Sequence, residues 1–242
     1  MDSRDGRGRR IPMLLTCLAL LAVSVATTGP ARAAMPERRT VPVGEFDRVH
    51  FAGAGTVRLS QGAAPRLVAR GPAALLDGLS VDTRNGTLHI RTPDHAAELV
   101  LELQVADLSA FVSEGDGTIM GDDLDFDALT LTGHGGGSFV MLRLEARELA
   151  VHGRGATRFD LTGQVHTHVV ELSGTGDYQA GELISDCVTL QVDGASDVRL
   201  WAELTLDVEV AGAASVRYAG SPQVEQRVSG VARVQRLPTI AI

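Results

Sequence analysis

Lysine is missing from this chain of 242 residues, so all 22 of its basic residues are arginine. Aromatic residues make up only 4 % against 44 % hydrophobic residues in all, which excludes a core built on large rings. The 30 acidic residues give a net charge of −8, which argues against nucleic acid or an anionic membrane surface as the partner. Glycine is abundant, at 27 residues. This composition predicts many turns around a core of Val, Leu and Ala.

Long apolar runs are also missing after residue 40, so the mature chain is predicted to have no transmembrane span. Residues 1–33 are predicted to be a signal peptide, with an arginine-rich start, an apolar core from Ile11 to Ala26 and small residues before Ala34. A membrane anchor is the alternative for this segment, and Arg9-Arg10 leaves twin-arginine export open. We expect an exported protein, located in the periplasm, at the cell surface or outside the cell.

Cysteine is scarce as well. Cys17 lies in the predicted signal peptide, so the mature chain keeps only Cys187 and cannot form an internal disulfide. The fold must therefore be held by packing. Residues 34–42 are polar and are expected to be a linker, and short strands separated by turns begin at Val43.

One phrase recurs six times from about Leu129 to Val234: an apolar–x–apolar strand, a small or polar residue, a glycine and a second strand. A degenerate copy precedes it. The lead glycines of these copies are Gly115, Gly133, Gly153, Gly174, Gly194, Gly212 and Gly230. Subtraction gives steps of 18, 20, 21, 20, 18 and 18 residues. Short strands at such a period predict an all-β fold, a right-handed parallel β-helix (solenoid) with coils of about 20 residues.

The lead glycines are predicted to be structural turn residues, because a coil that changes direction sharply often needs a positive φ. The second glycine of the phrase gives way to Ser196, Ala214 and Ala232 in later copies, so we predict that the first position is the more strictly required. The apolar pairs on either side of each turn, such as Leu149/Val151 and Val170/Leu172, are expected to stack from coil to coil.

Five segments carry a resemblance to a known family: the opening 43–49, the segments 57–62 and 85–90, the phrase 173–176 and the ending 216–222. Together they resemble the GIN domain, an auto-transporter adhesin head domain. The resemblance covers residues 43–236 and implies an exported β-helical protein at the bacterial cell envelope. It transfers no catalytic residues, because the family has no defined site. The chain departs from the family pattern at 193–196 and 211–214. Residues 237–242 are expected to be a C-terminal tail or cap, or a docking strand.

Two clusters invite a metal. His166 and His168 share one strand face, a spacing that suits a divalent ion, and 115–117 with 121–127 form an acidic cluster that suits calcium. Exposed strand positions explain the histidines, and a solvated acidic turn explains the carboxylates. We therefore assign no metal, no cofactor and no catalytic residue.

These observations lead to a non-enzymatic, exported β-solenoid that acts as an adhesin-like binding module at the bacterial envelope. The partner is expected to be an envelope polysaccharide or a surface protein. Binding is expected along outward residues of the stacked coils, among them Arg154, Thr175, Asp177, Asp197 and Arg199. A polysaccharide hydrolase or lyase and a structural, self-assembling envelope module are the alternatives, and the oligomeric state is left open.

Overall fold

The computed structural model describes residues 36–238, so the predicted signal peptide and Thr239–Ile242 of the predicted tail lie outside the described residues. The described part is almost entirely strand, with one helix, α1 (Ala73–Asp77). Its shorter N-terminal strands are β1 (Glu37–Val41), β2 (Arg48–Ala52), β3 (Thr56–Gln61), β4 (Arg66–Gly71), β5 (Ser80–Arg84), β6 (Thr87–Arg91), β7 (Val100–Val105) and β8 (Ala110–Glu114). The long strands are β9 (Thr118–Gly135), β10 (Ser138–Gly155), β11 (Arg158–Gly174), β12 (Asp177–Gly194) and β13 (Asp197–Gly212), and they are followed by β14 (Ser215–Ala219), β15 (Gln223–Gly230) and β16 (Arg233–Arg236).

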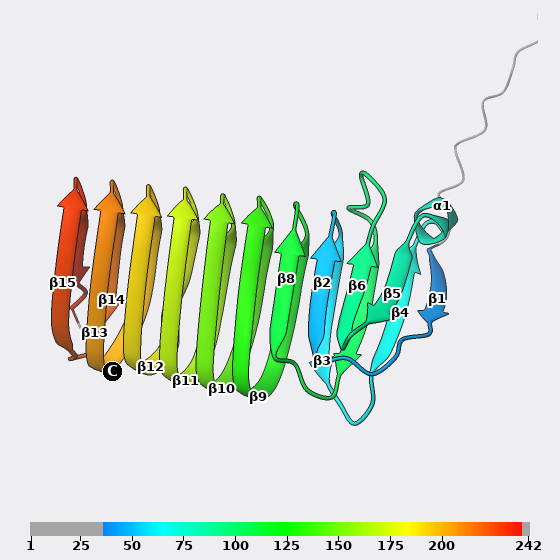
Figure 1. Cartoon of the computed structure of the whole chain (residues 1–242), viewed down its shortest axis with the longest axis horizontal. Coiled ribbons are helices and arrows are strands. Elements are labelled where there is room, and N and C mark those ends of the chain that lie inside the picture. Colours follow the sequence, from blue (N-terminus) through cyan, green and yellow to red (C-terminus); the bar gives the residue numbers. More distant parts are fainter. Residues whose placement is uncertain (1–35, 239–242) are drawn as a thin grey trace, which may run out of the picture. The chain divides into compact units, whose positions relative to one another are not determined.

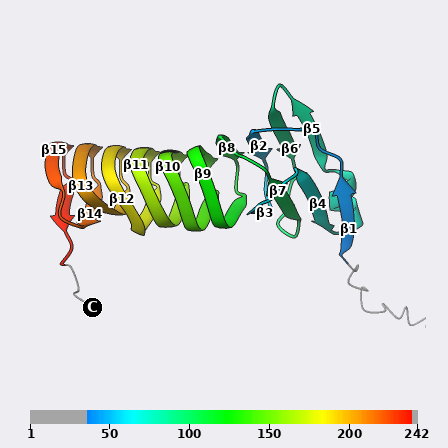
Figure 2. The same ribbon diagram turned by 90° about the horizontal axis from the view of Figure 1, so that it is seen from below.

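Each long strand bends and forms one coil, which pairs in parallel with the coil before and the coil after it. The fold is therefore a parallel β-solenoid, as predicted, with coils about 20 residues apart. We call the row made by β3, the first part of each long strand, β14 and β16 face A. The row made by β6, β2, β8, the later part of each long strand and β15 is face B. Figures 1 and 2 show the two rows back to back.

The N-terminal end of the solenoid does not follow chain order. Strands β2 and β3 form one coil, which lies between β6 and β7 on one side and β8 and β9 on the other. Strand β4 pairs antiparallel with β7, and β1 pairs antiparallel with β4. The stretch expected to be a linker therefore contains a strand. Asn85-Gly86 makes the tight turn between β5 and β6, with φ of 51° and 74°.

A column of rings fills part of the core beneath face A, so the expectation of a core without large rings was wrong there. Phe139, Phe159 and Tyr178 occupy the same place in successive coils and are all buried. The rings of Phe139 and Phe159 stack with centroids 5.0 Å apart, and Phe159 and Tyr178 follow at 5.8 Å. Val198 and Val216 continue the column. The apolar residues after each glycine turn therefore stack as the repeat predicts.

A second column, made of glycines, runs along the corner where face B turns into face A. Its members all have positive φ: Gly115, Gly135, Gly155, Gly174, Gly194, Gly212 and Gly230. The strand register joins each to the next from Gly135 onward, and Gly115 lies against Gly135. Five of the seven predicted lead glycines belong to it. The structure differs at the other two, where the left-handed corner lies two residues later, at Gly135 and Gly155 rather than at Gly133 and Gly153.

Gly133 and Gly153 have a different structural role from the corner glycines, because they face inward beside the ring column. A Cβ on Gly133 would lie 3.2 Å from the Phe139 ring, and one on Gly153 would lie 3.1 Å from the Phe159 ring. In the coil after Gly153 the same inward position is occupied by the buried Leu172, which is followed along the chain by Tyr178. The register consequently places His168, not Val170, next to Leu149. The predicted stacking of Val170/Leu172 on Leu149/Val151 is thus displaced by two residues.

Close contact between coils explains the need for glycine in the corner column. The Gly174 carbonyl accepts a hydrogen bond from the Ala195 N–H at 2.8 Å, which draws the two corners together. A Cβ on Gly194, where φ is +131°, would lie only 2.3 Å from that same Gly174 oxygen. Any larger residue is therefore excluded by backbone that cannot move without losing the hydrogen bond.

We predict that Gly194→Ala lowers the free energy of unfolding by about 1–3 kcal/mol, because it combines a strained φ with a clash against backbone. Gly181→Ala is the matched control in the same coil, since its φ is not left-handed and its Cβ would meet only the Arg199 Cβ, at 3.9 Å. Urea unfolding of both variants measures the difference. Equal stability of Gly194→Ala and Gly181→Ala would contradict the role given to the corner.

Candidate functional site

The outer side of face B carries long rows of polar side chains. Strand register places one residue of each coil in each row, and neighbouring strands lie about 4.8 Å apart. One row reads His89, His50, Val112, Thr132, His152, Glu171, Gln191, Glu209 and Arg227 from the first coil to the last. The row beside it contains Glu114, His134, Arg154, Ser173 and Asp193. The face thus offers hydroxyl, amide, imidazole, carboxylate and guanidinium groups in regular array.

A shallow groove of about 520 Å³ crosses the middle of this face. The side chains along it come from β9 to β12 and include Thr132, His134, His152, Arg154, Glu171, Ser173, Gln191 and Asp193. His152 Nδ1 lies 3.0 Å from a carboxylate oxygen of Glu171 in the next coil. Arg154, one of the outward residues predicted from the sequence, lies in this groove. We call this set of residues the central groove.

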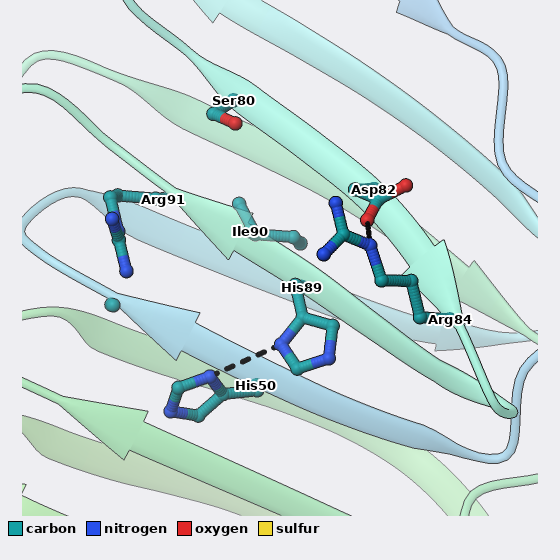
Figure 3. A pocket seen from close by; sticks show the side chains of 8 residues that line it. His50, Ser80, Asp82, Arg84, His89, Ile90 and Arg91 are labelled. Carbon is teal, nitrogen blue, oxygen red and sulfur yellow. Dashed lines mark hydrogen bonds and ion pairs between the residues drawn. The ribbon is translucent and has the colours of Figure 1, made fainter.

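A smaller hollow of about 280 Å³ lies on the same face near the N-terminal end, over β2, β5 and β6 (Figure 3). The rings of His50 and His89 meet edge to face there, with their Nδ1 atoms 3.4 Å apart. His50 Nε2 also lies 3.2 Å from Glu114 in β8, on the side of the central groove. Asp82 and Arg84 form an ion pair on the opposite wall of the hollow. Four of the seven histidines of the chain thus lie on the outer side of face B.

Three other residues predicted from the sequence, Asp177, Asp197 and Arg199, lie together on the outer side of face A. They share a depression with Arg158 and Arg217. Arg158 is paired with Asp177 at 2.9 Å, and the Arg217 guanidinium contacts both carboxylate oxygens of Asp197, at 2.6 and 2.7 Å. These charges neutralise one another across neighbouring coils, which leaves less of them to bind a ligand.

The last of the predicted outward residues, Thr175, is separate from both depressions. It is exposed at the corner between the faces, and its N–H donates to the Gly155 carbonyl. The sequence therefore located outward positions correctly but did not group them, because the repeat gives no information on which face a residue occupies.

The histidine pair considered for a metal is divided between two environments. His166 is exposed and lies 2.6 Å from Asp186, whereas His168 is fully buried in the core. His168 Nε2 lies 2.6 Å from the Tyr178 hydroxyl, and its Nδ1 lies 3.1 Å from the Ser185 hydroxyl. Burial lowers the pKa of His168 to about 3 and raises the pKa of Tyr178. The expectation that both histidines occupy exposed positions was wrong for His168.

Within residues 36–238 no group of three or more His, Cys, Asp or Glu side chains is close enough to hold a metal ion. The aspartates of 121–127 are divided among separate partners. Asp122 pairs with Arg143 at 2.7 Å and Asp127 pairs with Arg147 at 2.9 Å, both in the next coil. In the same described part, no helix has the length and apolar character needed to cross a membrane.

The geometry on face B suits recognition by many weak contacts. The groups of the central groove are exposed or half-buried, they include both donors and acceptors, and they repeat at the coil spacing. Such a surface can hydrogen-bond an extended ligand at several points along its length.

A family model described as "Putative auto-transporter adhesin, head GIN domain" matches residues 45–222. The chain belongs to the GIN-domain family. No curated protein matches it.

Solved structures share the fold of this GIN domain. A structure described as a "putative adhesin" from Bacteroides fragilis has a TM-score of 0.78 at 21 % identity, over 84 % of this chain and 97 % of that one. A "putative adhesin" from Parabacteroides merdae gives 0.64 at 14 %, over 85 % and 98 %. A "putative lipid binding protein" from Parabacteroides distasonis gives 0.63 at 15 %, also over 85 % and 98 %.

The buried His168 of this GIN domain gives a prediction about pH. Its pKa is about 3 in the folded state and about 6.5 in the unfolded chain, so between these values only the unfolded chain takes up the proton. Stability from this group is therefore complete above pH 6.5 and declines as the pH falls toward 3. From pH 7.5 to 4.5 we expect a loss of about 2–3 kcal/mol from His168.

Urea unfolding at the two pH values measures this loss in the unchanged protein and in His168→Leu/Tyr178→Phe, which removes both polar partners together. The double variant should lose about 2–3 kcal/mol less than the unchanged protein. An identical pH dependence in the two proteins would show that His168 does not remain neutral in the fold.

Proposed function

We propose that this GIN domain is a non-enzymatic binding module, exported to the cell envelope, whose ligand is an extended envelope polysaccharide lying along the outer side of face B. The observation that carries the proposal is the set of aligned polar rows through the central groove. A surface protein is the alternative ligand of the same face.

Regular spacing favours a polymer over a compact ligand. Each added coil brings another set of hydrogen-bonding side chains about 4.8 Å further along the solenoid. A chain molecule laid across the coils would meet Thr132, His152, Glu171 and Gln191 one after another. The individual contacts are weak, because the groove is open to water, so affinity depends on how many coils are engaged.

The comparisons support the class of function. The family and several structures with the same fold are named as adhesins rather than enzymes. An adhesin must face the outside of the cytoplasm, which agrees with the signal peptide expected at residues 1–33. The neighbour named as a lipid-binding protein makes lipid vesicles a necessary comparison in any binding assay.

We predict that the protein binds at least one polysaccharide of a bacterial-envelope panel and that His152→Ala/Glu171→Ala lowers the affinity about tenfold or more, since it removes two neighbouring groups from the groove. Glycan-array binding followed by calorimetry measures the affinity, and a reducing-sugar assay of the same mixtures reports turnover. Vesicles with neutral and anionic headgroups are tested alongside.

Arg158→Ala/Asp177→Ala is the matched control, because it removes a coil-to-coil ion pair of similar length from face A. Its affinity should equal that of the unchanged protein. Equal loss in both double variants would move the site away from face B. Released sugar would establish an enzyme instead, and binding to vesicles alone would replace the polysaccharide with a lipid.

A further inference from the structure

The last coil of the solenoid leaves one edge open within the described residues 36–238. There β15 pairs only with β13, and β16 pairs only with β14. Figure 1 shows this end far from β1 and α1 along the row of coils. The N–H and C=O groups on the outer edge of such a strand are available to another strand.

The inward-facing side chains of β15 are not covered. Val224 and Val228 are 39 % and 45 % exposed, whereas their counterparts one coil earlier, Leu206 and Val210, are each 1 % exposed. The two valines continue core columns that the next coil would normally cover. Between them Gln226 stands where the coil before has the buried Val208, so the core side of β15 has two exposed apolar positions around a central polar one.

We propose that β15 pairs with β15 of a second copy of this protein, antiparallel and around a two-fold axis at Gln226. The sequence of the strand is self-complementary in this register. Glu225 of each copy is set against Arg227 of the other, on the outer side. Val224 is set against Val228 on the core side. Opposite charges and aliphatic pairs directly across an antiparallel ladder both stabilise it.

Only this register sets opposite charges against each other on the outer side and aliphatic residues against each other on the core side. Residues opposite each other in an antiparallel pair share a face, so the two-fold axis must pass through a residue for core side to meet core side. An axis at Glu225 would set two glutamates against each other, and one at Arg227 would set two arginines against each other. The axis at Gln226 replaces both repulsions by two Glu–Arg pairs.

The remaining features of the two ends favour a closed pair over a head-to-tail filament. Among residues 36–238 the N-terminal end is finished by antiparallel strands, including β1 on β4, and presents no matching parallel coil. On face A, β16 carries Arg233 and Arg236 without an acidic residue, so the contact is assigned to β15. After β16, the Leu237 N–H donates to the Tyr218 carbonyl on face A. A two-fold contact uses the same patch twice and stops at two copies.

Sedimentation equilibrium of the protein over a wide concentration range tests the proposal. We expect a monomer–dimer equilibrium without larger species. Glu225→Arg and Arg227→Glu should each weaken dimerisation at least tenfold, because each sets two pairs of like charges against each other. An equimolar mixture of the two variants should restore association, since one chain then brings two positive and the other two negative groups. The double variant Glu225→Arg/Arg227→Glu should also associate normally.

The mixture is the decisive arm, because both chains keep whatever internal defect their substitution causes. Thermal melting of each single variant shows that it is folded. Recovery in the mixture supports the pairing. A monomer at every concentration, or a mixture that associates no better than the single variants, overturns it, as does dimerisation unaffected by the single changes.

Discussion

The fold depends on one contact that repeats at the successive corners from Gly135 to Gly212: the carbonyl of a glycine in one coil accepts a hydrogen bond from the residue after the matching glycine in the next coil. Thr175 N–H bonds to the Gly155 oxygen and Ala213 N–H bonds to the Gly194 oxygen, both at 2.8 Å. The bond brings backbone against backbone and leaves no room for a side chain. The contact continues the parallel ladders between coils, and these ladders set the spacing that aligns the rows on faces A and B.

Core volume explains the departures from a uniform repeat. Glycine stands beside Phe139 and Phe159, where large rings occupy the interior, and in the next coil the Leu172 side chain fills the space that Gly153 leaves open. The Tyr178 hydroxyl is buried and needs a partner, which His168 supplies at 2.6 Å. The buried histidine is thus a consequence of the single tyrosine in the ring column.

Much of the fold could be predicted from the sequence, because local patterns with period 2 and a repeat near 20 encode strands and coils directly. Apolar and polar residues alternate in 98–105, a pattern typical of a strand, and this stretch contains β7 with Leu101 and Leu103 buried. Asn85-Gly86 is typical of a tight turn and connects β5 to β6. The phase of the glycines was misjudged in two coils, because glycine serves both as a corner and as space for a ring. No local pattern distinguishes these two uses.

The order of coils and the grouping of surface residues could not be predicted, because both depend on contacts distant in sequence. Nothing in 48–61 shows that β2 and β3 lie between strands that follow them in the chain. Arg143 adopts a φ of 50° at a bend where sequence alone suggests no special backbone. The central groove likewise gathers residues about 20 positions apart, and they become neighbours only once the register is known.

The two proposals reinforce each other through the geometry of the sheet. In an antiparallel ladder, opposite side chains point to the same side, so two copies joined at β15 would continue face B with its outer side unbroken. The polar rows of one copy would then meet those of the other at Glu225 and Arg227. A polymer lying on this surface would contact twice as many coils, and its second set of contacts would form at a high effective concentration. Weak, repeated hydrogen bonds on an open groove gain most from such doubling, because each contact alone is too weak to retain the ligand.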